Sequence, residues 1–248
     1  MITVKTEEQL ERMRVSGKMT GDLLKYLEKI IKPGMSTLDV DKRAYEFIKS
    51  LGAEPSFLNY AGYPASTCVS IDDTVVHGIP SDDIIIREGQ IVSIDVGVYF
   101  NGYHGDAART FMIGDVGEEK RKLVEVTERC FFNAIEHITE GTPIGDIGYY
   151  VQSYAEANGF SVVRALGGHG IGSKMHEDPF IPNFGRKGTG IRLKQGMCIA
   201  VEPMINAGVF QVEFLSDGWT VKTKDRRPSA HYENTIAITS SGVEILTL

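Results

Sequence analysis

Cysteine is scarce in this sequence, and the few cysteines follow no binding pattern. The 248 residues include Cys68, Cys130 and Cys198, no two of which form a CxxC pair. An odd number without such spacing argues against a disulfide framework or a cysteine-type zinc site and is typical of a reducing compartment. The N-terminus has no signal-peptide pattern, and no stretch approaches the roughly 18 apolar residues of a membrane span. We therefore expect a cytoplasmic protein.

An excess of positive charge is missing as well. The chain has 26 Lys and Arg against 33 Asp and Glu, a net charge of -7, which disfavours a general nucleic-acid or membrane-surface binder. The P-loop, G-x-S-x-G and H-E-x-x-H motifs are also absent from the sequence. What remains is a globular chain with 42% hydrophobic and 24% charged residues, long enough for one large domain or two small ones.

The hydrophobic pattern predicts four helices and two regions of short strands. Thr6 with Gln9 resembles a capping box at the first helix, and Ser36 or Thr37 is the expected cap of the second. The predicted helices cover residues 7–31, 37–51, 118–140 and 144–158. Residues 55–80 and those after 160 are expected to form short strands with turns, and residues 91–113 a hairpin.

Two parts of the sequence repeat each other at a constant offset of 107 residues. Residues 34–52 and 141–159 each run from one glycine to another across a predicted helix, with an aspartate at the same position. The apolar strands that end at Asp95 and Glu202 have the same offset (202 minus 95). A shared offset at such distant points indicates an internal duplication.

We therefore predict one α+β domain over residues 1–248, with pseudo-repeats at about 7–113 and 118–239. Each half would contain two helices followed by strands. A pseudo-twofold axis between the halves would place Asp95 and Glu202 around a shared centre. The alternative is that two unrelated helix-then-strand segments resemble each other through composition alone.

The predicted hairpin would bring two carboxylates onto one face. Asn101-Gly102 is a strong signal for a two-residue turn, and that turn places Asp95 opposite Ala108. Asp106 is then the diagonal neighbour of Asp95 on the same face, roughly 7–8 Å away at most. A cation between them would remove the repulsion and desolvation cost of two buried carboxylates.

Two glutamates extend this pair to four carboxylates. Glu202 follows an apolar strand, and Glu233 lies in a strand-like alternation. Taken alone, either glutamate would more commonly be a solvent-exposed residue at a strand edge. A lone buried Asp95 would more commonly form an ion pair with Arg87 or Arg109. The complete set of four instead indicates a cation site.

One histidine stands in a segment of unusual composition. Four glycines surround His169 in Leu166-Gly167-Gly168-His169-Gly170-Ile171-Gly172. Because glycine permits close backbone approach and positive φ, we expect a tight turn that presents the imidazole. His77 and His176 are further candidates, although a lone histidine is more often a packed or exposed residue than a ligand.

Four carboxylates with one or two histidines form an oxygen-rich ligand set. Such a set suits Mn²⁺, Fe²⁺, Co²⁺ or Zn²⁺ together with water. Two ions about 3.5–4 Å apart, bridged by carboxylates and water, generate a nucleophilic hydroxide at neutral pH. The sequence therefore predicts a hydrolase with two divalent metal ions.

In their order along the chain, these motifs resemble the type I methionine aminopeptidases of the pita-bread (creatinase/aminopeptidase) fold, peptidase family M24. The resemblance extends from about residue 7 to residue 239. Prolidase-like relatives normally carry an additional N-terminal domain, and type II enzymes carry a long insertion for which this chain leaves no room. The matching motifs are Val76-His77-Gly78-Ile79-Pro80, Asp95 with Asp106, Gly168-His169-Gly170-Ile171-Gly172 with His176-Glu177, Val201-Glu202-Pro203 and Glu233-Asn234-Thr235.

The resemblance implies a methionyl aminopeptidase that removes the initiator methionine from nascent polypeptides when the second residue is small. A water or hydroxide that bridges two divalent metals would attack the peptide bond. By position, Asp95 would chelate one ion, and Asp106 and Glu233 would bridge both. His169 and Glu202 would complete the other ion, and Glu202 is also implied as the general base.

The resemblance also assigns residues to the substrate. His77 and His176 would contact the peptide and stabilise the tetrahedral intermediate. Aromatic and sulfur-containing side chains would enclose the methionine thioether, with ordinary core packing as the alternative for them. These residues are Tyr60, Tyr63, Cys68, Met175 and Trp219.

Three positions depart from the family pattern. Ala61 stands where histidine is common, Met175 where phenylalanine is common, and His231 where glutamine is usual. We expect the first two to reshape the methionine pocket and His231 to perturb the pH response of the metal site.

Two alternative functions belong to the same framework. One is an X-Pro aminopeptidase or dipeptidase of the same fold. The other is a non-catalytic peptide-binding or ribosome-associated relative, which is disfavoured because all five metal positions are filled. The family implies a monomer that binds the N-terminal peptide of nascent chains, with the ribosome as a further candidate partner and no nucleic-acid specificity or membrane contact.

Overall fold

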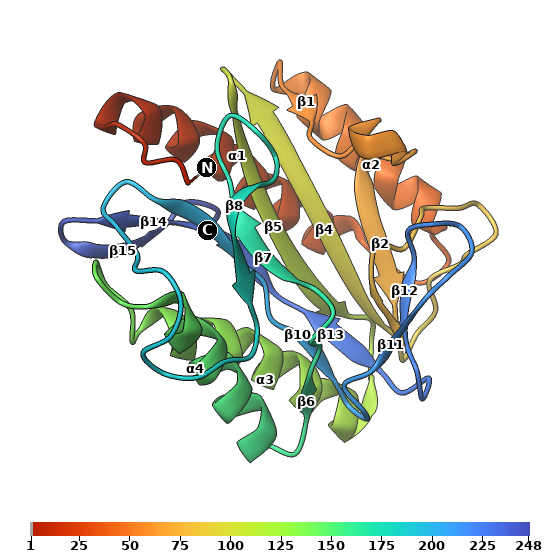
Figure 1. Cartoon of the computed structure of the whole chain (residues 1–248). Coiled ribbons are helices and arrows are strands. Elements are labelled where there is room, and N and C mark those ends of the chain that lie inside the picture. Colours follow the sequence, from red (N-terminus) through yellow and green to blue (C-terminus); the bar gives the residue numbers. More distant parts are fainter. Residues whose placement is uncertain (1) are drawn as a thin grey trace.

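The computed structural model describes residues 2–248, which form four α-helices and a set of mostly short strands (Figure 1). The helices are α1 (Glu7–Ile30), α2 (Thr37–Ser50), α3 (Gly117–Ile135) and α4 (Ile144–Ala157), with a short 3-10 helix at Tyr60–Gly62. The strands are β1 (Glu54–Pro55), β2 (Thr67–Ile71), β3 (Thr74–Val76), β4 (Ile91–Phe100), β5 (Tyr103–Met112), β6 (Ser161–Val162), β7 (Gly167–Gly170), β8 (Glu177–Pro182), β9 (Cys198–Val201), β10 (Met204–Asn206), β11 (Val212–Phe214), β12 (Val221–Thr223), β13 (Ser229–His231), β14 (Glu233–Thr239) and β15 (Gly242–Ile245). Among the described residues, no helix is both long enough and apolar enough to cross a membrane.

One large sheet forms the centre of the molecule. Its strand order is β1-β4-β5-β14-β9-β7-β8, and β2 also pairs with β4 and β15 with β14. Figure 1 shows α1 beside β4 and β5 and α2 beside β2, whereas α3 lies beside β10 and β13 and α4 packs on α3. The predicted α+β class is confirmed.

The arrangement is similar on the two sides of the β5–β14 pair. Outwards from this pair, one side continues with β4 and then β2, and the other with β9 and then β7. The short strands β1 and β6 begin 107 residues apart (161 minus 54), the offset found in the sequence. The division into repeats at 7–113 and 118–239 stays a prediction.

Three helices end within a residue of the predicted positions, and one prediction was wrong. Thr6 and Gln9 form the capping box of α1, and Ser36 rather than Thr37 caps α2. The third helix ends at Ile135, not at residue 140. Ile138 is buried in the core below α3, and the Thr139 backbone N–H donates to Thr142 Oγ1 at 3.0 Å instead of to a helical carbonyl.

Alternation along β4 divides its side chains between the core and the opposite face of the sheet. Val92, Ile94, Val96 and Val98 are fully buried in the cluster that includes residues of α1 and α2. Because successive side chains of a strand point to opposite faces, Asp95 points away from these helices. The hydrophobic pattern of the strand thereby fixes the direction of its carboxylate.

The register of the hairpin is the predicted one. Asn101 and Gly102 have φ angles of 48° and 88°, which a two-residue turn with both central residues left-handed requires. Asp95 lies opposite Ala108, and two residues further along Gly97 lies opposite Asp106. The two carboxylates are therefore diagonal neighbours on one face.

Candidate metal centre

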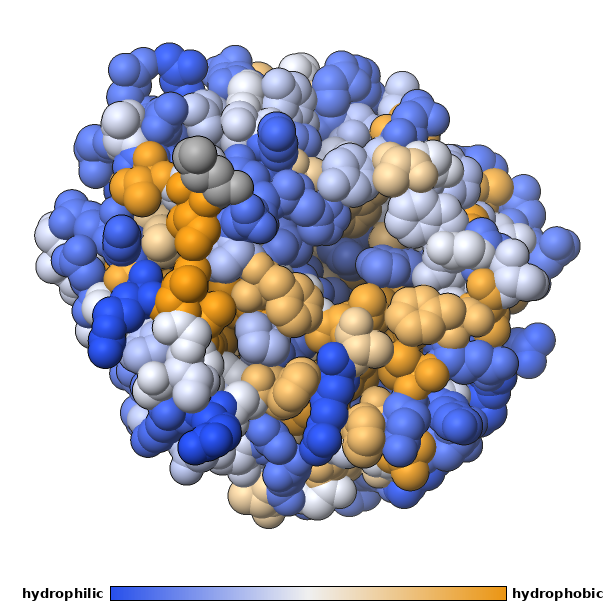
Figure 2. All heavy atoms as spheres, viewed as in Figure 1, coloured by the Kyte–Doolittle hydropathy of each residue, from blue (hydrophilic) through white to orange (hydrophobic). Residues whose placement is uncertain are grey.

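A single cavity of about 230 Å³ brings together all twelve site residues predicted from the sequence. Figure 2 shows a hollow near the centre of the viewed face, with a hydrophilic floor and hydrophobic side chains along its lower border. One further lining residue, Phe57, was not predicted; its nearness in sequence to Tyr60 and Tyr63 was the available signal. The cavity is lined by Phe57, Tyr60, Tyr63, Cys68, His77, Asp95, Asp106, His169, Met175, His176, Glu202, Trp219 and Glu233.

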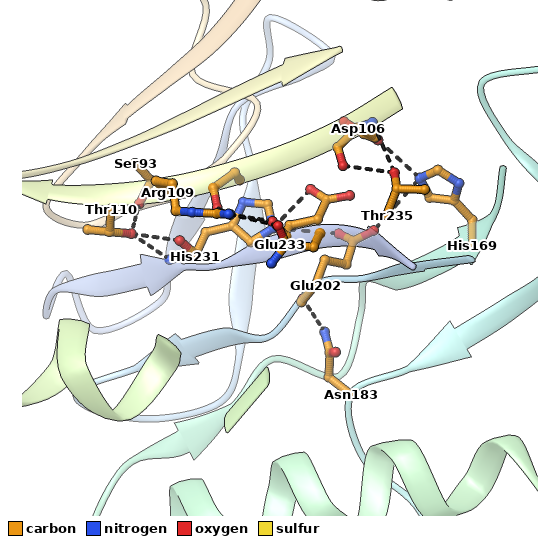
Figure 3. Close-up of polar contacts among 12 residues, drawn as sticks. Ser93, Asp106, Arg109, Thr110, His169, Asn183, Glu202, His231, Glu233 and Thr235 are labelled. Atoms are coloured by element: carbon orange, nitrogen blue, oxygen red, sulfur yellow. Dashed lines mark hydrogen bonds and ion pairs between the residues drawn. The ribbon is translucent and has the colours of Figure 1, made fainter. Parts of the chain in front are cut away.

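The acidic end of the cavity is built where the two halves of the sheet meet. Asp95 and Asp106 come from the hairpin, and Glu233 begins β14 directly opposite Ala108. Glu202 follows β9, and its carbonyl accepts a hydrogen bond from Asn183 Nδ2 at 2.9 Å (Figure 3). The four carboxylates thus converge from strands on both sides of the β5–β14 pair.

The segment around His169 is a strand, not the predicted turn. β7 runs between β8 and β9 so closely that a Cβ on Gly168 would lie 2.1 Å from Ala200 O, and one on Gly170 would lie 2.2 Å from Asp178 O. Neither glycine has a positive φ. Glycine is therefore needed on both sides of His169 for space, and the expectation of close backbone approach is confirmed.

The His169 imidazole is oriented by its own strand. Nδ1 lies 2.8 Å from Gly170 O, so we assign the ring proton to Nδ1 and leave Nε2 free to accept or to ligate. Nε2 faces Asp106 Oδ2 at 3.5 Å and Glu202 Oε1 at 3.9 Å (Figure 3). A hydrogen bond of this kind on one nitrogen is usual for a histidine that binds a metal through the other.

The carboxylates have no cationic partner within the described residues. No lysine or arginine nitrogen of residues 2–248 lies within 4 Å of them, and Asp95 Oδ1, Asp106 Oδ1 and Glu233 Oε1 are buried without a hydrogen bond. Burial raises the pKa of all four carboxyl groups, to about 7 for Asp106, and the charge of Asp106 raises the pKa of the other three further.

Arg109 does not pair with Asp95, so this alternative was wrong. Its guanidinium donates to the carbonyls of Ala108 and Glu233 and to Asn234 Oδ1, and it packs 4.2 Å from the centre of the Tyr232 ring. Arg109 therefore joins the backbones of β5 and β14 behind the site and leaves the carboxylates unneutralised.

This arrangement fits divalent cations. Two triads of donor atoms, each within 4.8 Å of one another, share Glu233: one contains Asp106 and His169, and the other contains Asp95 and His231. Four ionised carboxylates carry the charge that two divalent ions neutralise, and oxygen donors with imidazole suit Mn²⁺, Fe²⁺, Co²⁺ or Zn²⁺. The oxygens that lack protein partners are the atoms that such ions would bind.

Two further imidazoles border the cavity beside the carboxylates. His77 has a φ of 59°, in the left-handed region that non-glycine residues rarely adopt. His176 Nδ1 lies 2.8 Å from Tyr60 Oη, and its ring centre is 4.1 Å from that of His169. Burial lowers the pKa of both His77 and His176 to about 4, so both are neutral at pH 7 and can donate one N–H each.

The other end of the cavity is apolar. Tyr63 and Trp219 pack in a T-shaped arrangement with ring centres 5.0 Å apart, and the Tyr63 hydroxyl donates to the backbone carbonyls of Thr67 and Gly78. Cys68 and Met175 belong to the same buried cluster. The result is a small compartment of aromatic rings and sulfur next to the acidic end.

Comparisons with known proteins agree with this geometry. Residues 11–240 match the model of metallopeptidase family M24. A methionine aminopeptidase of Clostridium acetobutylicum is 50% identical over 248 residues, which cover 100% of this chain and 99% of that protein.

Solved structures give the same result for the fold. The crystal structure of methionine aminopeptidase from Rickettsia prowazekii superposes with a TM-score of 0.98 at 44% identity, covering 100% of both chains. The prolidase of Pyrococcus furiosus matches with a TM-score of 0.79 at 24% identity, covering 99% of this chain and 65% of the prolidase; at that identity the likeness concerns the fold alone. The predicted pita-bread fold is confirmed.

Proposed function

The chain belongs to metallopeptidase family M24 and to its methionine aminopeptidases, and we propose that it removes the initiator methionine from nascent polypeptides whose second residue is small. The observation that carries this proposal is the convergence of four carboxylates and His169 at one end of a cavity whose other end is apolar. A hydrolytic centre and a side-chain pocket in one compartment suit the cleavage of a peptide bond next to a single apolar residue.

The acidic end would hold two divalent ions. Asp95 would bind one of them, Asp106 and Glu233 would bridge both, and His169 and Glu202 would complete the second. When bound, such ions would supply an activated water and a Lewis acid for a peptide carbonyl.

The protein groups around that centre have separate tasks. Glu202 is partly buried, and its pKa is raised by loss of hydration and by the charges of Asp106 and Asp95, so it is suited to accept the proton of the attacking water. Neutral His77 and His176 would each donate an N–H towards the oxygen on which charge develops. The free α-amino group of the substrate would be anchored on the Asp95 side.

The apolar end would take the methionine side chain. The T-shaped pair of Trp219 and Tyr63, with Cys68 and Met175 nearby, provides polarizable contacts for a flexible thioether. Tyr60 is 39% exposed and hydrogen-bonds to His176, so it would form the rim between the two ends.

The test uses metal-free protein supplied with Mn²⁺ or Co²⁺ and two peptides, Met-Ala-Ser and Ala-Pro-Ala. We expect release of methionine from the first and no comparable cleavage of the second. Absence of turnover with Mn²⁺, Co²⁺, Fe²⁺ and Zn²⁺ alike would overturn the catalytic assignment. Faster cleavage of Ala-Pro-Ala would favour the X-Pro alternative, which now rests only on a shared fold.

The cellular setting follows from the proposed substrate. Chains that still carry their initiator methionine are found where they are synthesised, so we propose that the enzyme acts in the cytoplasm and close to the ribosome. From the family resemblance we also propose that it is a monomer. Ion-supported turnover in a size-separated monomer fraction would support the monomer assignment, and activity confined to a larger species would contradict it.

A further inference from the structure

His231 is held in a fixed position next to the proposed metal centre. It ends β13, two residues before Glu233, and is 1% exposed. Its backbone N–H donates to Thr110 Oγ1 at 2.9 Å, and its carbonyl accepts from the same hydroxyl at 2.8 Å. These bonds, together with pairing to Met204 in β10, fix the backbone of His231, and its buried imidazole faces the carboxylates (Figure 3).

The Nε2 atom of His231 has no hydrogen bond. It lies 3.6 Å from Glu233 Oε2 and 3.9 Å from Glu202 Oε2, both beyond ordinary hydrogen-bond distance. It is also one of the few fully buried side-chain polar atoms without a partner in the described residues, and three others of that group are carboxylate oxygens of the same site. A buried nitrogen is rarely left in this way.

The separation from Glu233 Oε2 is that of two atoms that share an ion, whereas Glu202 Oε2 lies slightly farther away. Two ligand atoms about 2.1 Å from one metal, and about 90–120° apart around it, are about 3.0–3.6 Å from each other. One ring nitrogen of His231 lies within 4.8 Å of donor oxygens of both Asp95 and Glu233. The other triad has the same composition, with His169 beside Asp106 and Glu233.

We propose that His231 Nε2 is an additional metal ligand, which binds the ion held by Asp95 and Glu233, so that each of the two ions has one imidazole. This inference rests on the proposed function, because it presupposes two ions. It assigns nitrogen ligation to the ion for which the family resemblance implies carboxylates alone. Imidazole favours Fe²⁺, Co²⁺ and Zn²⁺ over Mg²⁺ and Ca²⁺, so His231 would sharpen the selectivity of that position.

The experiment separates ligation from hydrogen bonding. His231→Gln keeps an N–H donor near Glu233 but replaces a strong ligand by a weak one, whereas His231→Ala removes both capacities. His137→Gln is the matched control, because His137 is exposed and hydrogen-bonds only to the backbone of Asn133 among the described residues. Metal-free parent and variants are titrated with Mn²⁺ and with Co²⁺ by calorimetry, and the visible absorption of bound Co²⁺ is recorded.

We expect two bound ions in the parent and in His137→Gln. Both His231 variants should bind one of the two ions about 10–100-fold more weakly, with a changed Co²⁺ spectrum. Parent-like affinity in both variants would overturn the proposal, and so would parent-like affinity in His231→Gln with a loss confined to His231→Ala, which indicates a hydrogen bond. Failure of the parent itself to bind two ions would instead contradict the proposed function.

A second measurement needs no variant. The parent, labelled with ¹⁵N in its six histidines, is titrated with Zn²⁺ and followed by NMR. We expect at least two imidazoles, from His169 and His231, to acquire the nitrogen shift of a metal-bound ring at full occupancy. A metal-bound shift for His169 without one for His231 would overturn the inference even if the His231 variants fail to fold.

Discussion

The two sides of the β5–β14 pair supply ligands to one site but position them by different means. On the N-terminal side, Asp95 and Asp106 lie on ten-residue strands joined by a two-residue turn. On the C-terminal side, His169 lies on a four-residue strand compressed between two neighbours, and Glu202 follows another of four residues. Local pairing suffices for the first arrangement, whereas the second requires distant segments to be in place.

Removal of a central carboxylate from either side tests whether the two sides contribute equally. Asp106→Asn and Glu233→Gln should each lower kcat/KM for Met-Ala-Ser by about 10³-fold or more, because each removes a bridging ligand. Calorimetry should give a parallel loss of Mn²⁺ affinity. If one variant keeps the affinity of the parent, the shared site does not include that side.

The same two variants should have the opposite effect on the metal-free protein. Each removes one member of a buried cluster of like charges, whose confinement destabilises the fold in the absence of cations. Thermal unfolding of metal-free Asp106→Asn and Glu233→Gln should therefore occur at a higher temperature than that of the parent. A lower temperature for both would mean that the carboxylates stabilise the fold by themselves.

The loop that carries His176 depends on a buried ion pair with the N-terminal segment. Lys5 Nζ lies 2.9 Å from Glu177 Oε2, and both side chains are buried; Thr3 also donates to Glu177. Glu177→Gln should lower the free energy of unfolding by about 3 kcal/mol, because a buried ammonium loses its charged partner. Urea unfolding measures this loss, and KM should rise because His176 is less firmly held.

The effect of Glu177→Gln on the free energy of unfolding should depend on pH in a definite direction. Burial raises the pKa of Glu177, but hydrogen bonds from Thr3 and Lys5 outweigh it and hold the pKa below its ordinary value. The stability that Glu177 contributes is therefore present above the unfolded pKa of about 4.3 and is lost as the pH falls below it. The difference in the free energy of unfolding between the parent and Glu177→Gln should shrink as the pH falls from about 6 to about 3.

Glu244→Gln is the matched control, because it breaks a more exposed ion pair with Arg14. This variant should lose less than about 1 kcal/mol in the free energy of unfolding.

Alanine at two glycines should distinguish the two ways of positioning ligands. At Gly168 the new Cβ would meet Ala200 O, so Gly168→Ala should destabilise the fold by about 2–3 kcal/mol and weaken metal binding at His169. At Gly102 nothing lies within 4 Å of a Cβ, and the cost comes from the left-handed backbone, about 1 kcal/mol. Equal midpoints of urea unfolding for Gly168→Ala and Gly102→Ala would contradict the proposal that the two sides of the β5–β14 pair position their ligands by different means.

The smallest expected effect concerns the helices that correspond at the 107-residue offset. Ser36 Oγ accepts from the Asp39 backbone N–H at 3.0 Å and caps α2, so Ser36→Ala should cost about 1 kcal/mol. The corresponding residue of α4 is Pro143, which makes no side-chain cap, so Pro143→Ala should change the free energy of unfolding by about 0.5 kcal/mol or less. A larger loss at Pro143 would reverse this contrast.

The hairpin could be predicted in detail because its structure is local. Asn101-Gly102 fixes the turn, the turn fixes the register, and the alternation of β4 fixes the face on which Asp95 lies. Nothing outside residues 91–113 is required for that deduction. The capping box at Thr6 was predictable for the same reason.

The C-terminal side could be predicted only in part. A glycine-rich segment has the same composition whether it turns or runs between two close strands, so the sequence did not distinguish these for His169. The contact of Arg109 with Glu233 and Asn234 joins residues more than 120 positions apart, and no local pattern encodes it. The placement of His231 Nε2 depends in the same way on the packing of β13 against Thr110.

The left-handed backbone at His77 has a consequence for repeated turnover. A non-glycine residue in this conformation raises the free energy of the folded state by about 1–3 kcal/mol relative to a relaxed residue. The rest of the fold offsets this strain once, when the protein folds. The imidazole of His77 is then already in place when each peptide arrives. Binding of the peptide therefore carries no entropy loss for ordering this side chain. A flexible loop in the same place would impose that entropy loss anew on every molecule processed.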